Sequence, residues 1–279
     1  NLDYNDFKIS TQVWHEEGKF LITSNEEELR ITRKIDIKHP KLESFAEMYS
    51  GVKAYEVGKG NPPQTKEIRD AKPYTSKFQK DDEWKPFFEG KHIERYKLNW
   101  NSNSWILYGQ WLAAPRDEEN FEGEKILIRK IVSNTLICNY ISYTSYCNTL
   151  LFLLKLNKNA RISYKCLLGI LNSKLIGWYY RHKFQISDDD TFPQIMIRDI
   201  LKFPISNKNH KAIAATVDDL LTYNSKLQDS KFNFTNLILD NFDISGVSKK
   251  IERFYELEFK QFLSELKKQR RCWFEVWKL

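Results

Sequence analysis

The sequence predicts an α+β fold, in which a twisted, mostly antiparallel, β-rich domain carries one long packing helix and is followed by C-terminal helices. Two observations support this prediction. Short apolar runs separated by turn signals fill the middle of the 279-residue chain, as expected for a succession of short strands. Apolar residues at helical spacing dominate from residue 163 onwards, and they predict helices over 163–182, 208–227 and 251–271.

The predicted strands lie between residues 88 and 154. NSNS at residues 101–104 is typical of a turn between two strands, and Pro115 ends the second of them. The segment KILIRKI at 125–131 alternates, which predicts a partly buried strand with a basic side chain near each surface. Two more strands are expected on either side of SYTSY at 142–146.

Three segments outside this region have their own local patterns. Apolar residues at helical spacing in 41–55 predict a short helix that ends at Ser50 and Gly51. The alternation in 192–205 predicts a strand or an extended return that stops at Pro204. A short alternation at 6–14 predicts an edge strand.

Composition limits the classes of function. Hydrophobic residues make up 41% of the chain, enough for a sizeable core, and the net charge of +7 favours a polyanionic partner, although a basic soluble protein without one is an alternative. Four cysteines without a CxxC pair disfavour a zinc site and fit reduced thiols in the cytoplasm. The three acidic residues at 188–190 fit a turn or a cap better than a metal site, since consecutive residues rarely converge on one ion. No apolar run reaches the roughly 18 residues of a membrane span.

The loop at residues 55–67, YEVGKGNPPQTKE, has three interpretations. NPPQ resembles the NPPY motif of amino-methyltransferases, but Gln64 cannot stack on a base as an aromatic residue does, and no glycine-rich cofactor loop precedes it. A flexible loop is the second interpretation. In the third, VGKG approaches a DNA backbone, because glycines permit close approach and Lys59 supplies charge. Residues 71–84, where lysines alternate with acidic residues, are expected to be solvated surface.

Six blocks between residues 88 and 206 resemble, in order, the TaqI-like C-terminal specificity domain of Type IIG-like restriction–modification methyltransferases, also called the target recognition domain. The resemblance covers 52–206 and loosely the helices that follow. The blocks are GKHIERYKLNW (Gly90–Trp100), YGQWLAAPR (Tyr108–Arg116), KILIRKI (Lys125–Ile131), CNTLLFLL (Cys147–Leu154), LLGILNSKLIGWYYRHKF (Leu167–Phe184) and DTFPQIMIRDILKFPIS (Asp190–Ser206).

The resemblance implies a target recognition domain over 1–206 and a C-terminal helical region over 207–279. Such a domain binds double-stranded DNA in a sequence-specific way and directs a partner domain to methylate an adenine in its site. The residue at position 1 is Asn rather than Met, so we expect a fragment of a longer bacterial, cytoplasmic protein. The fragment is expected to have no catalytic residue and no cofactor. S-adenosylmethionine (SAM) and Mg are expected for the parent enzyme, an adenine-specific methyltransferase with or without endonuclease activity.

The resemblance gives no list of DNA-contacting residues, so we select candidates by the chemistry of their side chains. Cations suit phosphates, Arg pairs bidentately with guanine, and Asn or Gln pairs with adenine. The candidates for phosphate contact are Lys59, Lys91, Arg95, Lys125 and Lys183. The candidates for base contact are Gln110, Arg116, Arg129 and Asn148. Tyr108 and Trp111 are candidates for stacking, although half of such aromatic residues belong to the core.

Two alternatives belong to other classes of function. The chain could be a catalytic methyltransferase or nuclease fragment, which would require SAM binding or metal-dependent cleavage by this chain alone. It could instead be a protein-interaction domain whose helices assemble a larger complex. Such a domain would show no salt-dependent affinity for DNA.

Overall fold

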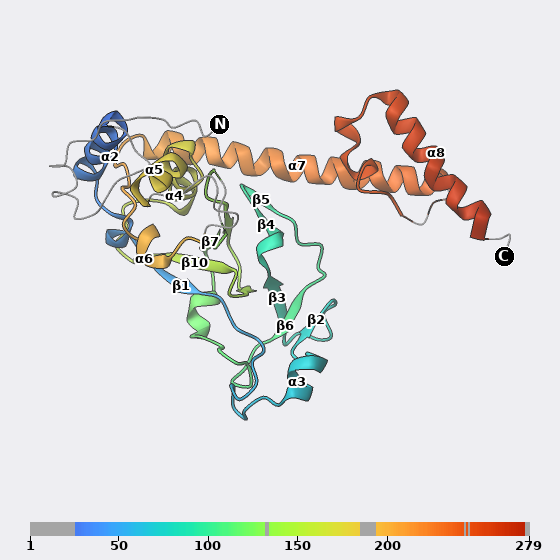
Figure 1. Cartoon of the computed structure of the whole chain (residues 1–279), viewed down its shortest axis with the longest axis horizontal. Coiled ribbons are helices and arrows are strands. Elements are labelled where there is room, and N and C mark those ends of the chain that lie inside the picture. Colours follow the sequence, from blue (N-terminus) through green and yellow to red (C-terminus); the bar gives the residue numbers. More distant parts are fainter. Residues whose placement is uncertain (1–25, 132–133, 185–193, 243, 245, 277–279) are drawn as a thin grey trace, which may run out of the picture. The chain divides into compact units, whose positions relative to one another are not determined.

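The computed structural model describes residues 26–131, 134–184, 194–242, 244 and 246–276, and its helices and strands confirm the α+β class (Figure 1). The chain divides into two compact units, residues 1–219 and 220–279. The helix α7 (His210–Phe242) runs from the first unit into the second.

An antiparallel four-stranded sheet with the order β1-β10-β7-β8 forms the centre of the first unit. Its strands are β1 (Ala46–Ser50), β7 (Lys125–Arg129), β8 (Cys138–Ile141) and β10 (Leu151–Leu156). The register pairs Leu153 of β10 with Tyr49 on one side and with Leu127 on the other.

A second four-stranded sheet, with the order β2-β6-β3-β9, packs against the first. Its strands are β2 (Thr75–Ser76), β3 (Trp84–Phe88), β6 (Trp105–Leu107) and β9 (Tyr146–Cys147). Only the pair of β3 and β9 is parallel among the described ladders. A small hairpin of β4 (Ile93–Glu94) and β5 (Lys97–Leu98) completes the β structure.

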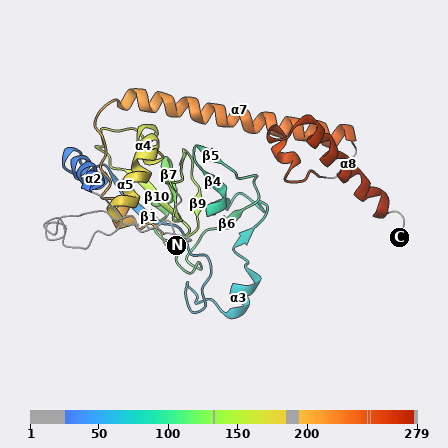
Figure 2. The same cartoon turned by 45° about the horizontal axis from the view of Figure 1, so that its top comes forward.

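Helices cover the other face of the first sheet. The helix α4 (Tyr164–Leu171) contacts β7 and β8, while α5 (Lys174–Phe184) contacts α4 and α2 (Glu26–Lys38). Figures 1 and 2 both show these three helices on the side of the sheet away from β3 and β6. Because protein covers both faces, Ile126, Leu127 and Ile128 of β7 are all buried. The segment is therefore a strand as predicted. Its residues 125–128 are buried on both faces, and Arg129 at its end is half-buried.

The predicted helix over 163–182 is two helices with a break at Asn172 and Ser173. The hydroxyl of Ser173 accepts a hydrogen bond from the N–H of Ile176 and caps α5 at 3.1 Å. The buried Asn172 side chain pairs with both backbone groups of Cys138 in β8, accepting at 2.9 Å and donating at 3.0 Å. The break thus docks the helix pair onto the sheet edge.

The short helix predicted to end at Ser50 and Gly51 is wrong. A short 3₁₀ turn, η1 (Leu42–Ser44), leads into β1, in which Ala46 and Met48 point to the interior. Pairing with the buried strand β10 outweighs the local helical pattern. Gly51 follows a strand and is therefore not a helix cap. Glycine is needed here because a Cβ at this position would collide with the carbonyl oxygen of Asn148.

Other predicted elements differ in extent. The strand or extended return predicted over 192–205 is wrong in the described residues 194–205. They contain a helical turn, α6 (Ile197–Ile200), between isolated bridges at Gln194 and Pro204. The first C-terminal helix is longer than predicted, since α7 continues to Phe242. The second is a 3₁₀ segment, η4 (Ile251–Glu256), followed by α8 (Phe259–Val276). The edge strand expected at 6–14 and the acidic run at 188–190 lie outside the described residues.

The second unit has a small apolar core of its own. Ile238, Ile251 and Leu266 are buried there, and the rings of Phe234 and Phe254 lie 4.1 Å apart. No helix in the described part of the chain is long and apolar enough to cross a membrane.

Replacing Asn172 with Ala should lower the free energy of unfolding by about 1–3 kcal/mol, because the buried N–H of Cys138 would lose its acceptor and its carbonyl would keep only the long contact with the N–H of Tyr96. Denaturant titration of the full chain measures this change. The control Asn207→Ala, at an exposed position, should stay within about 0.5 kcal/mol of the unchanged protein. Equal effects of the two substitutions would contradict a docking role for Asn172.

Candidate nucleic-acid interface

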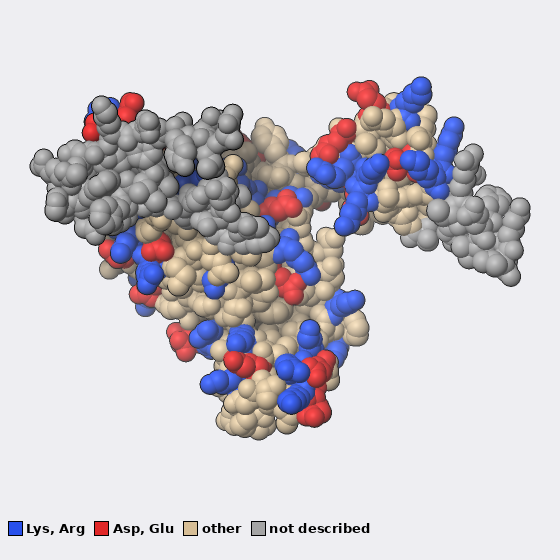
Figure 3. All heavy atoms as spheres, viewed as in Figure 1, with Lys and Arg blue, Asp and Glu red and all other residues tan. Residues whose placement is uncertain are grey.

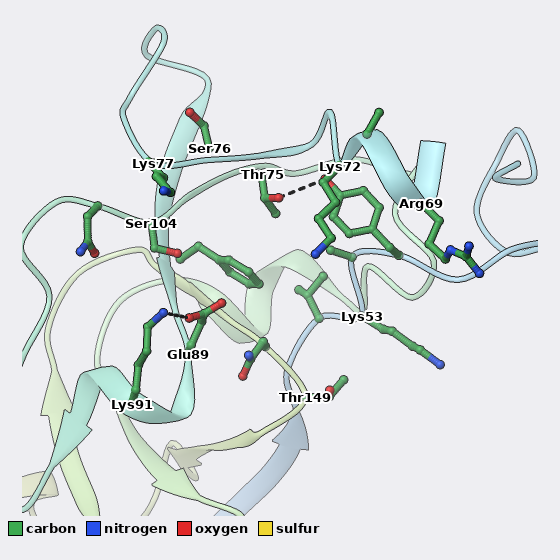
Figure 4. Close-up of a pocket in the computed structure, with 17 residues that line it drawn as sticks. Lys53, Arg69, Lys72, Thr75, Ser76, Lys77, Glu89, Lys91, Ser104 and Thr149 are labelled. Carbon is green, nitrogen blue, oxygen red and sulfur yellow. Dashed lines mark hydrogen bonds and ion pairs between the residues drawn. The ribbon is translucent and has the colours of Figure 1, made fainter. Parts of the chain in front are cut away.

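A basic groove of about 780 Å³ lies in the first unit. Five stretches of chain line it, within residues 52–55, 69–77, 87–91, 103–104 and 148–149. Figure 4 shows how their side chains surround the opening. Its cationic residues are Lys53, Arg69, Lys72, Lys77 and Lys91. Glu89 is the one carboxylate among its lining residues. We call this site the basic groove.

The parallel pair of β3 and β9 builds the floor of the basic groove. Phe88 pairs with Cys147, and both are fully buried. The N–H of Asn148 donates to the carbonyl of Phe88 at 2.9 Å, which continues the ladder by one residue. Glu89 and Asn148, the residues that follow the two strands, therefore lie at the same end of the parallel pair and line the floor.

One wall of the basic groove is tied to the other through Tyr55. Its hydroxyl accepts a hydrogen bond from the N–H of Tyr74 at 2.7 Å and lies 3.2 Å from the hydroxyl oxygen of Thr75. Burial raises the pKa of the Tyr55 hydroxyl, so it stays protonated over the physiological range. The wall at 52–55 is thereby held against the segment that carries Lys72 and Lys77.

Two of the five cations in the basic groove have no ion-pair partner among the described residues, namely Lys72 and Lys77. The other three form short-range pairs with exposed or half-exposed carboxylates: Lys53 with Glu56 at 2.7 Å, Arg69 with Asp70 at 2.8 Å and Lys91 with Glu89 at 2.6 Å. Solvent-accessible pairs of this kind contribute little, so a phosphate can replace the carboxylate at small cost. On the face seen in Figure 3, basic and acidic side chains are interspersed and form no continuous basic surface.

The NPPQ loop is pinned through the buried side chain of Gln64. Its amide donates to the carbonyls of Ala54 and Trp111, both at 2.8 Å, and its oxygen accepts from the N–H of Glu56 at 2.9 Å. These bonds occupy the side chain that a methyltransferase motif would present to a base, and they make the loop a fixed turn.

Lys59 and Gln110 are brought together at this pinned loop. Lys59 lies exposed between two glycines with positive φ, Gly58 and Gly60. A Cβ at Gly60 would lie 2.5 Å from the carbonyl oxygen of Trp111, so only glycine fits. The N–H of Asn61 donates to the carbonyl of Gln110 at 2.8 Å, and the Gln110 side chain is exposed beside it.

The assignment of Lys125 to a phosphate is wrong, because its side chain is fully buried. The ammonium group donates to the carbonyls of Phe121, Gly123 and Tyr143 at 2.7–2.9 Å. Loss of hydration lowers the pKa of Lys125 to about 8. The lysine therefore joins two loops inside the protein and is inaccessible to DNA.

Two further phosphate candidates are used in contacts within the fold. The guanidinium of Arg95 donates to the carbonyl of Asn172 at 2.8 Å and lies over the ring of Tyr96. Lys183 pairs with Asp36 of α2 at 2.7 Å. Burial raises the pKa of Asp36, but hydrogen bonds from Lys183 and Lys41 lower it by more, so the pKa lies below its usual value. Neither residue lines the basic groove.

The two stacking candidates pack against the protein core. The ring of Tyr108 stacks on Tyr146 at 4.6 Å, and its hydroxyl donates to the carbonyl of Arg116. The indole N–H of Trp111 donates to the carbonyl of Leu107 at 3.2 Å. Both side chains contact the core, which fits the core role that sequence left open, but both are only partly buried, and their stacking role stays a prediction.

Arg116 and Arg129 lie outside the basic groove. Arg116 is exposed and has a positive φ of 69°. Arg129 is half-buried at the end of β7. Of the eleven predicted site residues, the basic groove contains Lys91 and Asn148.

Sequence reasoning missed Lys53, Arg69, Lys72, Lys77 and Glu89. Residues 71–84 were expected to be solvated surface because nearby acidic residues cancel the charge. Folding separates these charges, since Lys77 faces the basic groove while Asp81, Asp82 and Glu83 do not line it. The pairing of β2 with β6, which places this segment, was not visible in a run as short as Thr75–Ser76.

Comparison with known proteins gives two family matches. Residues 85–205 match the TaqI-like C-terminal specificity domain, and residues 206–279 match a domain of unknown function (DUF8810). A protein of Methanocaldococcus jannaschii that bears the name of a type II restriction enzyme and methyltransferase, RM.MjaORFECS2P, is 26% identical over 159 residues. That alignment covers 56% of this chain and 13% of the relative, so the chain spans a small part of the relative's length.

Two solved structures align with 79% of this chain at 13% identity. One comes from work on complex assembly and conformational transition of the type I R-M system, with a TM-score of 0.37 and coverage of 50% of that chain. The other is the HsdS subunit from Thermoanaerobacter tengcongensis, with a TM-score of 0.28 and coverage of 49%.

Replacing Lys125 with Met should destabilise the protein, because three buried carbonyls lose their donor, but it should leave the salt dependence of DNA binding unchanged. The pKa of Lys125 is lower in the folded chain, about 8, than the ordinary value of 10.5. The unfolded chain therefore binds more protons between these values, and the stability due to Lys125 rises with pH across that window.

Urea titrations of both proteins from pH 7.5 to 10 measure this effect. The difference in unfolding free energy between the unchanged protein and Lys125→Met should grow with pH. A difference that is constant, or that shrinks, would contradict the buried, desolvated state of this lysine.

Proposed function

Because residues 85–205 belong to the TaqI-like C-terminal specificity domain family, we propose that the chain is a sequence-recognition module that binds a short site in double-stranded DNA. The module belongs to a restriction–modification protein. The basic groove carries this proposal, since it joins five cations to a floor of polar side chains within one unit of the fold.

The chemistry of the basic groove suits a duplex. Lysine and arginine neutralise phosphates and release counterions, which supplies affinity that is independent of sequence. Polar side chains on the floor meet the edges of bases, which supplies specificity. The polar residues that line the groove are Thr75, Ser76, Asn103, Ser104, Asn148 and Thr149.

We place a second contact at the pinned loop of Lys59 and Gln110. The positive-φ glycines expose the loop backbone, and Lys59 offers a charge to a phosphate next to the possible base reader Gln110. Arg116 and Arg129 remain proposed base readers outside the basic groove.

We also propose an activity for the parent protein. A methyltransferase domain binds SAM and methylates an adenine of the site after extracting it from the base stack. A nuclease, where present, uses Mg. Within the described residues no group of three or more His, Cys, Asp or Glu side chains could hold a metal ion. Methylation of adenine within the recognised site by the whole parent protein and SAM tests this part.

Exposed apolar side chains in the second unit favour an assembly role for the C-terminal helices. Phe232, Leu237 and Phe259 are each more than half exposed. Large apolar side chains that are exposed to water are available for contact with another protein surface. We assign them to the methyltransferase part of the parent protein, so Phe232→Ser with Leu237→Ser should weaken that association and leave DNA affinity unchanged.

Selection from a random duplex pool tests the recognition function. The full chain is incubated with the pool at two salt concentrations, and the retained DNA is sequenced. Enrichment of one short motif, with affinity falling steeply as salt rises, is the expected result. No binding at low salt would overturn the proposal, and salt-dependent binding without enrichment would overturn sequence recognition by this chain.

Replacing Lys77 with Gln should weaken binding to all sequences alike and reduce the slope of log affinity against log salt by about 0.9, the value for one phosphate contact. Fluorescence anisotropy across a salt series measures the slope. The matched control Lys158→Gln removes an exposed charge that does not line the basic groove. It should leave the slope nearly unchanged, and equal slopes for the two variants would contradict the placement of DNA in this groove.

A further inference from the structure

Glu89 is an unexpected residue for a surface that binds phosphates. It is the one carboxylate that lines the basic groove, and five cations surround it. A carboxylate repels a phosphate, so a groove that only gripped the DNA backbone would bind better without it. Figure 4 shows its carboxylate near the middle of the labelled residues, where bound DNA would meet it.

The backbone holds Glu89 firmly in this place. Phe88 on one side and Gly90 on the other are buried. The N–H of Glu89 donates to the ring Nδ1 of the buried His92 at 3.0 Å. Desolvation lowers the pKa of His92, which keeps the ring neutral and able to accept this bond. The Glu89 side chain therefore extends from a fixed point at the end of β3.

A hydrogen-bond donor stands beside this acceptor. The oxygen of the Asn148 side chain accepts from the N–H of Leu150 at 3.1 Å, which leaves the amide N–H₂ as the outward group. That amide has no hydrogen-bond partner among the described residues. Because Glu89 and Asn148 end two paired parallel strands, the floor presents an acceptor and a donor side by side.

The ion pair with Lys91 does not use up the carboxylate. Lys91 contacts one oxygen, Oε2, at 2.6 Å, and its side chain is 72% exposed. The Glu89 side chain also accepts the backbone N–H of His92 in a capping box. A carboxylate has about four acceptor positions, so it can accept a further hydrogen bond beside these two contacts. Lys91 can also turn to a phosphate, which leaves the capping-box bond to His92 as the remaining contact of the carboxylate.

We propose that Glu89 is a specificity-determining residue that accepts a hydrogen bond from the exocyclic amino group of a base in the major groove. This inference rests on the proposed function of the basic groove. In the major groove only cytosine N4 and adenine N6 offer such a donor, and carboxylates pair with it there. Asn148 donates to the neighbouring acceptor, which is N7 on adenine or O6 of the guanine paired with cytosine. Guanine or thymine at this position meets an unpaired carboxylate and is rejected.

Selection of DNA by variants of the full chain tests the proposed role of Glu89. Glu89→Gln keeps the shape and removes the charge, while Glu89→Asp keeps the charge and withdraws the acceptor. Glu94→Gln is the matched control, since Glu94 is exposed, pairs with Lys97 and does not line the groove. Each variant and the unchanged chain select from the same random duplex pool, and melting temperatures verify that each is folded.

The unchanged chain and Glu94→Gln should enrich one motif that contains a cytosine or an adenine at one position. Glu89→Asp should lose about tenfold in discrimination at that position alone. Glu89→Gln still has an accepting oxygen and a donating amide, so it should shift the preference at that position toward adenine. Affinity for unselected DNA should not fall in Glu89→Gln, because the groove has lost a negative charge. The identity of the relaxed base distinguishes cytosine from adenine.

The outcomes separate this inference from the function on which it rests. If the unchanged chain enriches a motif and both Glu89 variants enrich the same motif with the same discrimination, Glu89 does not read a base. A uniform change in affinity for all sequences, with discrimination at that position unchanged in both variants, would show that Glu89 acts only through charge, and it too overturns the inference. If the unchanged chain enriches no motif, the proposed function fails first.

Discussion

The close approach of the chain at Gly51 to the chain at Asn148 holds this fold together. The N–H of Val52 donates to the carbonyl of Cys147 at 2.7 Å, and the N–H of Gly51 donates to that of Leu151 at 3.2 Å. Here the chain leaves the second sheet at β9 and enters the first at β10. Only a residue without a side chain allows this contact, because a Cβ at Gly51 would overlap the carbonyl of Asn148. The same crossing sets the floor of the basic groove, so the core and the candidate site depend on one constraint.

The two kinds of lysine in this chain show how the environment decides function. Lys125 occurs in an alternating run beside Arg129, and its sequence context looks like that of a strand at a surface. The fold covers both faces of that strand, and three carbonyls take the place of water around the ammonium group. Lys72 and Lys77 lie in a polar segment with no periodic pattern, yet they face an open groove. Charge alone therefore predicts a polyanionic partner but does not identify the residues that meet it.

The sequence predicts the strands best where two signals agree. The segment 125–131 combines alternation with β-branched residues, and the run at 151–156 is continuously apolar, so both are strands in the structure. The segment 41–55 has apolar residues at helical spacing, but its neighbour in space is β10, more than a hundred residues later. A pattern within fifteen residues contains no information about that partner. For the same reason the break at Asn172 was missed, since its cause is Cys138 in another element.

The candidate site follows the same rule. Asn148 and Lys91 were found because they lie in blocks with recognisable chemistry, whereas Glu89 had no local signal. Its importance comes from its position at the end of β3, beside Asn148 at the end of β9.

This arrangement separates stability from recognition. Glu89 and Asn148 are half-exposed. The residues just before them, Phe88 and Cys147, are fully buried and pack in the core. Side chains at such strand ends can change at little cost to the core, because surface substitutions away from packed features alter stability only slightly. Under the role proposed for the basic groove, a change of floor residues gives a new DNA site, while the buried pairs beneath them keep each new side chain in the same place.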